Sequence, residues 1–507
     1  MKLITKFMYT LHRILGTLLS FLFVMWFLSG FVMMYHGFPR VRQSHKMEHQ
    51  ETLASGQTPN SLLPIDSVLQ ALPEGIEKVE GMSLRREEGR TVLSLRSREQ
   101  ALSLPVDTLG PLPEKVESEG PVSWEVVMNT VTTWCEAPVS RVDTLHRLDQ
   151  WIPFGQLKKE LPIYKFYFDD AEHHQLYVGS QSGETLQFTT RSQRRWAWVG
   201  AIPHWVYITQ LRQDVDLWRK VVIWLSGIGC IMVIAGLWVG IDVWRKTSKR
   251  KRGAFSPYRK KWYHWHYVTG IVFGIFALTF VFSGMMSLAD IPSWISSPKL
   301  NVNPQRAFSQ PKPEVGQYVL DYRDVLSAYP EAKVLEWNNF CKHPYYVVTG
   351  DGPTAYVDAS SVQPTPLQLS EDEIVAAVKS VYSHAEQEVD IEAELIDDFE
   401  LYYRNRSHGV SAPLLPVWKL RTHDIDHTVY YVNPASASVQ AVNTTRRLEY
   451  WTYSALHSLR ILGLSSNDVL RKTLLWILLL GGTAVSITGF VLGTRYIIRL
   501  CRRIGRK

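Results

Sequence analysis

The sequence lacks the motifs of nucleotide-dependent enzymes and of zinc or thiol redox proteins. It has four cysteines in 507 residues and no C-x-x-C pair, which argues against a structural zinc site or a thioredoxin-like centre. No G-x-G-x-x-G follows a predicted strand, and no G-x-x-x-x-G-K-[ST] is present. These absences argue against a dinucleotide-binding domain and against ATP as the energy source.

The few cysteines are dispersed along the chain. Cys230 falls within an apolar run and Cys501 near the basic C-terminus, whereas Cys135 and Cys341 fall in two separate polar stretches. The sequence allows either a disulfide between Cys135 and Cys341 or two isolated thiols.

Four long apolar runs punctuate the chain, and each is close to the roughly 20 residues that cross a bilayer as a helix. A polar stretch long enough for a domain separates the first run from the second, and another separates the third from the fourth. The first run has no small-residue cleavage site after it, so we expect an uncleaved anchor. The runs are Ile14–Tyr35, Val221–Val243, Val268–Leu288 and Leu474–Ile498.

Basic residues predict the orientation. The short stretch that starts at Trp244 is dense in Lys and Arg and contains no Asp or Glu, and both termini are also basic. Short positively charged loops stay in the cytoplasm. We therefore expect both termini and the middle loop inside, and both large domains outside. Because the basic residues lie at helix ends, the net charge of +7 does not indicate nucleic-acid binding.

The two halves of the chain repeat one another. LHRILGTLLSFLFVMWFLSG, from Leu11, matches WHYVTGIVFGIFALTFVFSG, from Trp265, so that His12 corresponds to His266. Further along, His204 corresponds to His457 and Gly236 to Gly489. An ionisable side chain in or beside a membrane helix is a functional candidate. Two histidine pairs related by a repeat suit the axial ligands of haem iron.

Each polar stretch ends in a similar pair of predicted strands. LPIYKFYFDDAEHHQLYV, from Leu161, matches LPVWKLRTHDIDHTVYYV, from Leu415. Two β-rich runs around a polar turn predict a hairpin, and upstream residues 126–134 and 371–383 favour helices. The turns contain His173, His174, His423 and His427, which we expect at the surface, with weak metal capture as the alternative.

The aromatic hairpin resembles the PepSY module. Its placement between helices that begin LHRILG and end after ALHSL resembles the PepSY-associated transmembrane family. The resemblance implies a bacterial inner-membrane protein of an often iron-regulated family that includes haem-containing ferric-siderophore reductases. The expected fold is a membrane α-helical protein, with four transmembrane helices in two repeated halves and two α+β PepSY-like periplasmic domains.

This organisation predicts a series of segments along the chain. They are transmembrane helix 1 (1–36), periplasmic domain 1 (37–193), an interfacial segment with transmembrane helix 2 (194–244), a basic cytoplasmic loop (245–261), transmembrane helix 3 (262–289), periplasmic domain 2 (290–445), an interfacial segment with transmembrane helix 4 (446–498) and a cytoplasmic tail (499–507).

We expect two haem b groups, an inner one held by His12 and His266 and an outer one held by His204 and His457. Gly16 and Gly270, one helical turn beyond the inner histidines, would let a flat ring approach the backbone. The Ser-Gly pairs at 29–30 and 283–284 are typical of small-residue helix contacts.

Alternatives to these ligands remain open at this point. His36 is a rival ligand at the outer site, and His264 is one at the inner site. The aromatic residues around the outer histidines could instead form an interfacial belt beside solvated imidazoles.

The function implied by the resemblance is electron transfer across the membrane to a ferric siderophore or another ferric chelate. The donor would be separate, either a cytoplasmic reductase or membrane quinol, because the inner loop is too short for a flavin domain. Rival interpretations are a peptide- or cell-wall-binding protein and a transport component for a siderophore or metal.

Overall fold

The protein is represented by a computed structural model that describes residues 2–55, 58–70, 81–87, 89–96, 101–107, 121–249, 256–296, 308, 315–383, 389–403, 415–461 and 463–504. The middle of the predicted cytoplasmic loop (250–255) and the end of the predicted tail (505–507) lie outside these residues.

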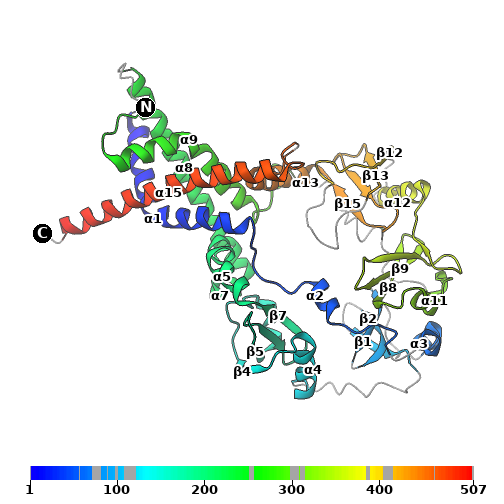
Figure 1. The fold of residues 1–507 in the computed structure, drawn as a ribbon. Coiled ribbons are helices and arrows are strands. Elements are labelled where there is room, and N and C mark those ends of the chain that lie inside the picture. Colours follow the sequence, from blue (N-terminus) through cyan, green and yellow to red (C-terminus); the bar gives the residue numbers. More distant parts are fainter. Residues whose placement is uncertain are drawn as a thin grey trace. The chain divides into compact units, whose positions relative to one another are not determined.

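Four long helices form a bundle (Figure 1). In the described part of the chain, these four are long and apolar enough to cross a membrane, as the four apolar runs predict. α1 and α9 lie opposite one another, and each packs against both α8 and α15. The four are α1 (Lys2–Met33), α8 (Val215–Lys249), α9 (Lys261–Met286) and α15 (Asp468–Ile504).

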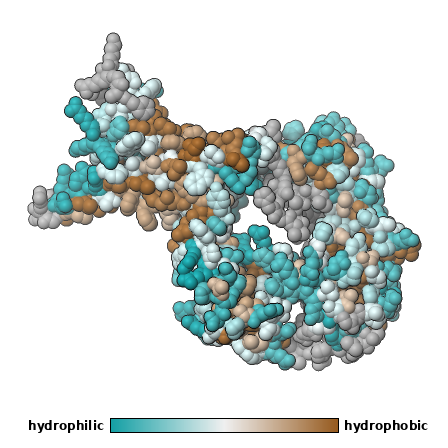
Figure 2. All heavy atoms as spheres, in the orientation of Figure 1, coloured by the Kyte–Doolittle hydropathy of each residue, from teal (hydrophilic) through white to brown (hydrophobic). Residues whose placement is uncertain are grey.

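The bundle is apolar on its outside as well as its inside. Leu18 on α1 and Trp224 on α8 are each 71% exposed, and Leu480 on α15 is 57% exposed. Figure 2 shows many apolar residues on the face of the bundle that is in view. A helix that is hydrophobic all round is stable only in an apolar environment, so these faces suit contact with lipid.

The chain forms two compact units. One contains Met1–Val41, Gly120–Pro292 and Leu448–Lys507, and the other contains Arg42–Glu119 and Ser293–Arg447. The first predicted domain (37–193) is therefore divided between the units. The division arises because strand β1 pairs with β8, placing Leu84 opposite Leu335, and both side chains are fully buried in one core.

The sheet that joins the two distant segments has the antiparallel order β11-β10-β9-β8-β1-β2-β3 among the described residues. Buried Met82 and Leu84 alternate with more exposed residues in the first half of β1, as expected for a strand with one face on a core. Its strands are β1 (Gly81–Glu87), β2 (Arg90–Arg96), β3 (Ala101–Pro105), β8 (Ala332–Phe340), β9 (His343–Gly350), β10 (Ala355–Asp358) and β11 (Thr365–Pro366); short helices nearby are α2 (Gln43–Glu48), η1 (Pro59–Ser61), α3 (Ile65–Gln70), η3 (Val315–Gln317) and α11 (Tyr322–Ala328).

The same unit contains the second predicted hairpin. Here β13 (Val417–Thr422) and β14 (Val429–Val432) lie between β12 (Ile391–Ile396) and β15 (Val439–Val442) in a four-stranded antiparallel sheet of described residues. The predicted helix α12 (Glu371–Ser383) packs on it through Ile374 and Val378, which share a core with Leu420 and Tyr430. The hairpin and the helix are both confirmed.

The first predicted hairpin belongs to the unit that holds the bundle. Its described residues form the sheet β4-β5-β6-β7, with β4 (Val139–Leu145), β5 (Ile163–Phe168), β6 (Gln175–Gly179) and β7 (Thr185–Thr189). Helix α4 (Trp124–Trp134) covers one face, where Val127 and Val131 meet Phe166. Residues near the other face, including Tyr177, share a core with α5 (Arg191–Val199), α6 (Ala201–Trp205) and the start of α8.

Short helices connect each hairpin to the bundle. A capping box between Thr190 and Gln193 begins α5, and it satisfies backbone N–H groups that would otherwise be unpaired. The remaining connections are α7 (Thr209–Arg212), α13 (Thr444–Glu449), the π-helical turn η4 (Tyr450–Ala455) and α14 (Leu456–Ser458), while η2 (Gly155–Glu160) lies between β4 and β5.

Candidate functional site

The four predicted histidines meet as two pairs. The rings of His12 on α1 and His266 on α9 have centroids 6.1 Å apart and planes inclined at 24°. The rings of His204 on α6 and His457 on α14 have the same centroid separation, 6.1 Å, with planes inclined at 59°. The structure therefore brings together the residues that the repeat predicts as partners.

The two pairs lie at opposite ends of the bundle. His12 is near the start of α1, whereas Gly30, near its end, would place a Cβ 3.9 Å from Cε1 of His204. Likewise His266 is near the start of α9, and a Cβ on Gly284 would lie 3.6 Å from Cε1 of His457. His12 and Gly30 are eighteen residues apart, as are His266 and Gly284. Eighteen residues span about 27 Å along a helix. That length approaches the roughly 30 Å hydrocarbon core of a bilayer.

Serine hydroxyls hold the outer histidines. Ser29 donates to the Trp26 carbonyl oxygen at 3.1 Å, and its Oγ lies 3.1 Å from Nδ1 of His204. Ser283 donates to the Phe280 carbonyl oxygen at 3.1 Å, and its Oγ lies 3.0 Å from Nδ1 of His457. Because each hydroxyl proton is directed to a carbonyl, the serine oxygen is the acceptor for the imidazole N–H.

The inner histidines have similar partners at the same ring nitrogen. Nδ1 of His12 lies 3.1 Å from the carbonyl oxygen of Met232 on α8. Nδ1 of His266 lies 3.1 Å from Oγ1 of Thr488 on α15, whose hydroxyl donates to the Ala484 carbonyl oxygen at 2.8 Å. Both partners again act as acceptors.

These contacts favour one tautomer in all four rings. A neutral imidazole has a single N–H, and each acceptor requires it at Nδ1. The lone pair is consequently at Nε2, the nitrogen that remains available to a metal. Bonds of this kind also orient a ligating ring and increase its basicity. For the outer pair, burial is the largest cause that lowers the pKa of His204 and of His457 to about 4, so both are neutral at pH 7.

The same left-handed backbone conformation follows the outer histidine in each half. Val206 and Leu459, two residues after His204 and His457, are both left-handed, with φ values of 53° and 51°. A β-branched residue such as Val rarely adopts this conformation. The segments are secured by hydrogen bonds to the residue after each histidine. Trp218 donates Nε1–H to the Trp205 carbonyl oxygen at 2.8 Å, and Arg471 donates to that of Ser458 at 3.2 Å.

Glycines leave room for the inner rings. A Cβ on Gly236 would lie 2.6 Å from Cε1 of His12, and one on Gly489 would lie 3.2 Å from Cε1 of His266. In contrast, a Cβ on Gly270 would meet nothing within 4 Å. Since Gly270 follows His266 by four residues, it lies on the same helix face as that histidine. There is therefore space beside the inner pair.

A cavity of about 650 Å³ adjoins the outer pair. Its volume is within the range of ligand pockets, roughly 300–1,000 Å³. Apolar side chains from the bundle form much of its lining, including Trp26, Phe27, Phe280, Val281 and Leu479. Its lining also contains four cationic side chains: Arg40, Arg460, Arg471 and Lys472.

The two rival histidines lie in other contacts. His36 is exposed, and its ring stacks on Trp196 with a centroid distance of 4.5 Å and an interplanar angle of 5°. His264 contacts the Trp265 ring edge-on at 5.5 Å. Neither stands in the paired arrangement of the other four histidines. The four cysteines are free thiols.

Sequence reasoning did not identify the serines as histidine partners. Ser29 and Ser283 were predicted only as small-residue helix contacts, although their recurrence beside the repeated histidines was a usable signal. The repeat did not predict Thr488 as the partner of His266, because the inner pair does not use equivalent acceptors in the two halves.

Comparison with known families identifies the chain. The sequence profile of the PepSY-associated TM region matches residues 143–495. The protein belongs to this family. The match includes His204, His266 and His457, whereas His12 precedes it. No curated protein matches the chain. Together with the four apolar helices, membership makes this PepSY-associated protein a multi-pass membrane protein.

Proposed function

We propose that the protein is an inner-membrane b-type haem protein that transfers electrons to a periplasmic acceptor. One observation carries the proposal: two histidine pairs occupy opposite ends of the bundle, and all four Nδ1 atoms are engaged. Each pair can therefore present two Nε2 lone pairs to one iron.

The ring separation fits axial ligation. Metal–imidazole bonds are about 2 Å long, so two such bonds and the two ring radii place the centroids about 6 Å apart. Both pairs have centroids at 6.1 Å. His12 and His266 would hold the inner haem b, and His204 and His457 the outer one.

The surroundings of the outer pair also suit haem. A porphyrin has apolar faces and two carboxylates, and the cavity combines apolar walls with cationic side chains such as Arg40 and Lys472. Arginine and lysine stabilise carboxylates through charge-assisted hydrogen bonds. Neutral imidazoles and an apolar lining agree with this ligand better than with a hydrated free cation.

When bound, haem iron gains and loses one electron at a time, with a potential set by its ligands and its surroundings. The chain's own residues would orient the histidine Nε2 atoms, and the apolar cavity lining would limit the access of water. The hydroxyl oxygens of Ser29, Ser283 and Thr488 accept hydrogen bonds from the imidazole N–H groups. Gly236 and Gly489 let the inner rings lie against α8 and α15. Histidine rings held in this way would need little rearrangement when bound to a metal that changes its charge.

The direction of transfer rests on the basic residues. Arg245 and Lys246 end α8, and Lys261 begins α9, at the bundle end that holds His12 and His266. Positive ends stay in the cytoplasm, and on this basis we propose that both termini lie inside and both hairpin-containing regions lie in the periplasm. A cytoplasmic reductase or membrane quinol would supply electrons at the inner pair.

The acceptor that we propose is a ferric siderophore or another ferric chelate, as the family resemblance implies. Reduction to iron(II) weakens its binding by hard oxygen ligands and so releases the metal. We also propose that the halves are duplicated and contain PepSY-like hairpins. In support, His173 and His427 at the two hairpin turns have φ values of 48° and 47°.

Optical spectroscopy of the purified protein tests the proposal. Dithionite should produce the sharp bands of reduced low-spin haem, with about two haem groups per chain in a pyridine haemochrome assay. His12→Ala and His266→Ala should each lose the inner one of the two haem groups, whereas His264→Ala should retain both. A colourless wild-type protein after expression with adequate haem would refute the function. Loss in His264→Ala alone would refute the inner ligand assignment.

A further inference from the structure

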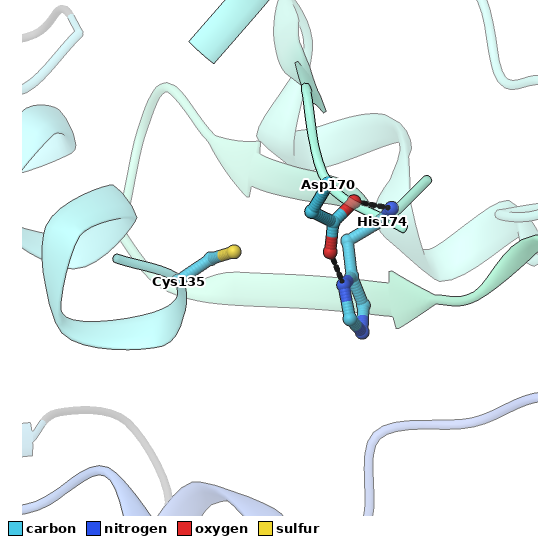
Figure 3. A group of neighbouring side chains, drawn as sticks. All are labelled: Cys135, Asp170 and His174. Atoms are coloured by element: carbon cyan, nitrogen blue, oxygen red, sulfur yellow. Dashed lines mark hydrogen bonds and ion pairs between the residues drawn. The ribbon is translucent and has the colours of Figure 1, made fainter. Parts of the chain in front are cut away.

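A cluster of side chains of metal-ligand type lies outside the bundle, in the domain of β4–β7. Cys135 follows helix α4, and Asp170 and His174 belong to the turn between β5 and β6. One potential ligand atom from each of the three side chains lies within 4.8 Å of the others. Figure 3 shows the thiol of Cys135 directed toward the gap between Asp170 and His174.

The turn holds its two residues in place. Asp170 accepts the backbone N–H of His174 through Oδ1 at 2.9 Å, and its Oδ2 bonds Nδ1 of the same residue. The imidazole also stacks on Phe188, with centroids 4.6 Å apart and planes at 2°. All three candidate ligands are half-buried, so they are partly ordered by packing and still open to an ion from solvent.

The corresponding turn in the second hairpin shows which contacts of Asp170 serve to form the turn. Asp424 accepts the backbone N–H of Thr428 at 2.7 Å, just as Asp170 accepts that of His174. Its other oxygen, however, accepts hydroxyls from Thr428 at 2.7 Å and Tyr382 at 2.9 Å. The aspartate therefore suffices to make the turn. Histidine and cysteine beside it are additions found at the first hairpin.

We propose that Cys135, Asp170 and His174 bind a borderline divalent transition ion, represented by Zn²⁺. Thiolate, imidazole and carboxylate are the ligand types that Zn²⁺ takes, and three protein ligands leave one position for water. Bonds of about 2.0–2.3 Å bring ligand atoms within about 4 Å of one another, so closing the site requires a movement of roughly 1 Å. On binding, the ion replaces the thiol proton, which passes to solvent. The imidazole keeps its one N–H on the ring nitrogen that does not ligate, so ligation through Nδ1 exchanges the hydrogen bond with Asp170 for a bond to the ion.

This site does not involve the histidine pairs, and its test needs neither haem reduction nor an electron acceptor. The full-length protein is stripped with a chelator and then alkylated with a maleimide, with and without added Zn²⁺. Peptide mass spectrometry reports each cysteine separately. We expect Zn²⁺ to slow modification of Cys135 by about tenfold or more, because a metal-bound thiolate is withdrawn from reaction. Cys341, also half-buried, serves as the internal control.

Two histidine variants make the test specific. His174→Ala should abolish the protection and lower bound zinc by one ion per chain, measured by elemental analysis after gel filtration. His173→Ala should keep both, because that neighbouring side chain is exposed and is not a member of the cluster. Equal alkylation of Cys135 with and without Zn²⁺ would overturn the proposal. Full protection in His174→Ala would equally overturn it.

Discussion

The hydroxyl oxygen of Ser29 lies 3.1 Å from Nδ1 of His204, while the hydroxyl proton is directed to the carbonyl oxygen of Trp26. A residue predicted as a small spacer between helices therefore determines which histidine nitrogen is available. Ser283 has the same relationship to His457. The two serines that contact the outer histidines therefore lie near the ends of α1 and α9, although the histidines belong to α6 and α14.

Removing this hydroxyl should weaken the outer haem site specifically. Ser29→Ala leaves the Nδ1–H of His204 without its acceptor, and loss of such a partner typically costs about 10- to 100-fold in metal affinity or activity. We expect weaker retention of the outer haem and a shifted reduction potential, measured by haem titration and by spectroelectrochemistry. The inner haem should be unaffected.

A matched threonine provides the control for this variant. Thr279 on α9 donates to the Phe276 carbonyl oxygen at 2.9 Å, much as Ser29 donates to that of Trp26. Thr279→Ala should leave both potentials unchanged. Equal effects of Thr279→Ala and Ser29→Ala would attribute the loss to the helix backbone rather than to histidine orientation.

A single methyl group at Gly236 should disturb the inner site. Its Cβ would lie 2.6 Å from Cε1 of His12, closer than non-bonded carbons approach, so the ring must move. Gly236→Ala should therefore lose about half of the bound haem, assayed as pyridine haemochrome. Gly227→Ala on the same helix is the control, because its Cβ would lie 3.7 Å from Sδ of Met285. Full haem content in Gly236→Ala would show that the inner site does not depend on the close approach of His12 to α8.

Orientation can be tested without reference to haem. The basic stretch between α8 and α9 predicts that reporter fusions at Ser248 and Lys507 are cytoplasmic. Fusions at Ser103 and Gly350 should be periplasmic. Paired alkaline phosphatase and fluorescent protein fusions measure this, since each reporter is active on only one side. Phosphatase activity at Ser248 would reverse the proposed direction of electron transfer.

Periodicity and repetition in the sequence were sufficient to predict the four helices, both hairpins and the pairing of His12 with His266. These features depend on local patterns, or on symmetry that is visible in the chain. The pairing of β1 with β8 was not predictable in this way. It joins Leu84 to Leu335, residues so far apart that only the buried core they share selects the contact.

The details of the sites also depend on tertiary packing. The strands β4 and β5 separate Cys135 from His174 in the chain. The sequence predicted Cys135 as an isolated thiol or a disulfide partner and His174 as a surface residue or a weak metal ligand, but it did not place the two side by side. The hydrogen bond between His12 and Met232 uses a backbone carbonyl, a group that every residue possesses. Only the packing of α1 against α8 identifies this particular acceptor.

The outer pair should control the exit of electrons from the protein. If His204 and His457 hold the haem nearest the periplasm, removing either should interrupt transfer to an external ferric chelate. The inner pair lies about 27 Å away along the helices, so its haem should stay reducible. In His457→Ala, dithionite should still reduce the inner haem, but reoxidation by an added ferric chelate should slow at least about tenfold in stopped-flow absorbance. The control is His36→Ala, which should reoxidise at the wild-type rate, because that exposed ring stacks on Trp196. Unchanged reoxidation in both His204→Ala and His457→Ala would remove these residues from the electron path. Slow reoxidation in His36→Ala would instead indicate an asymmetric outer site.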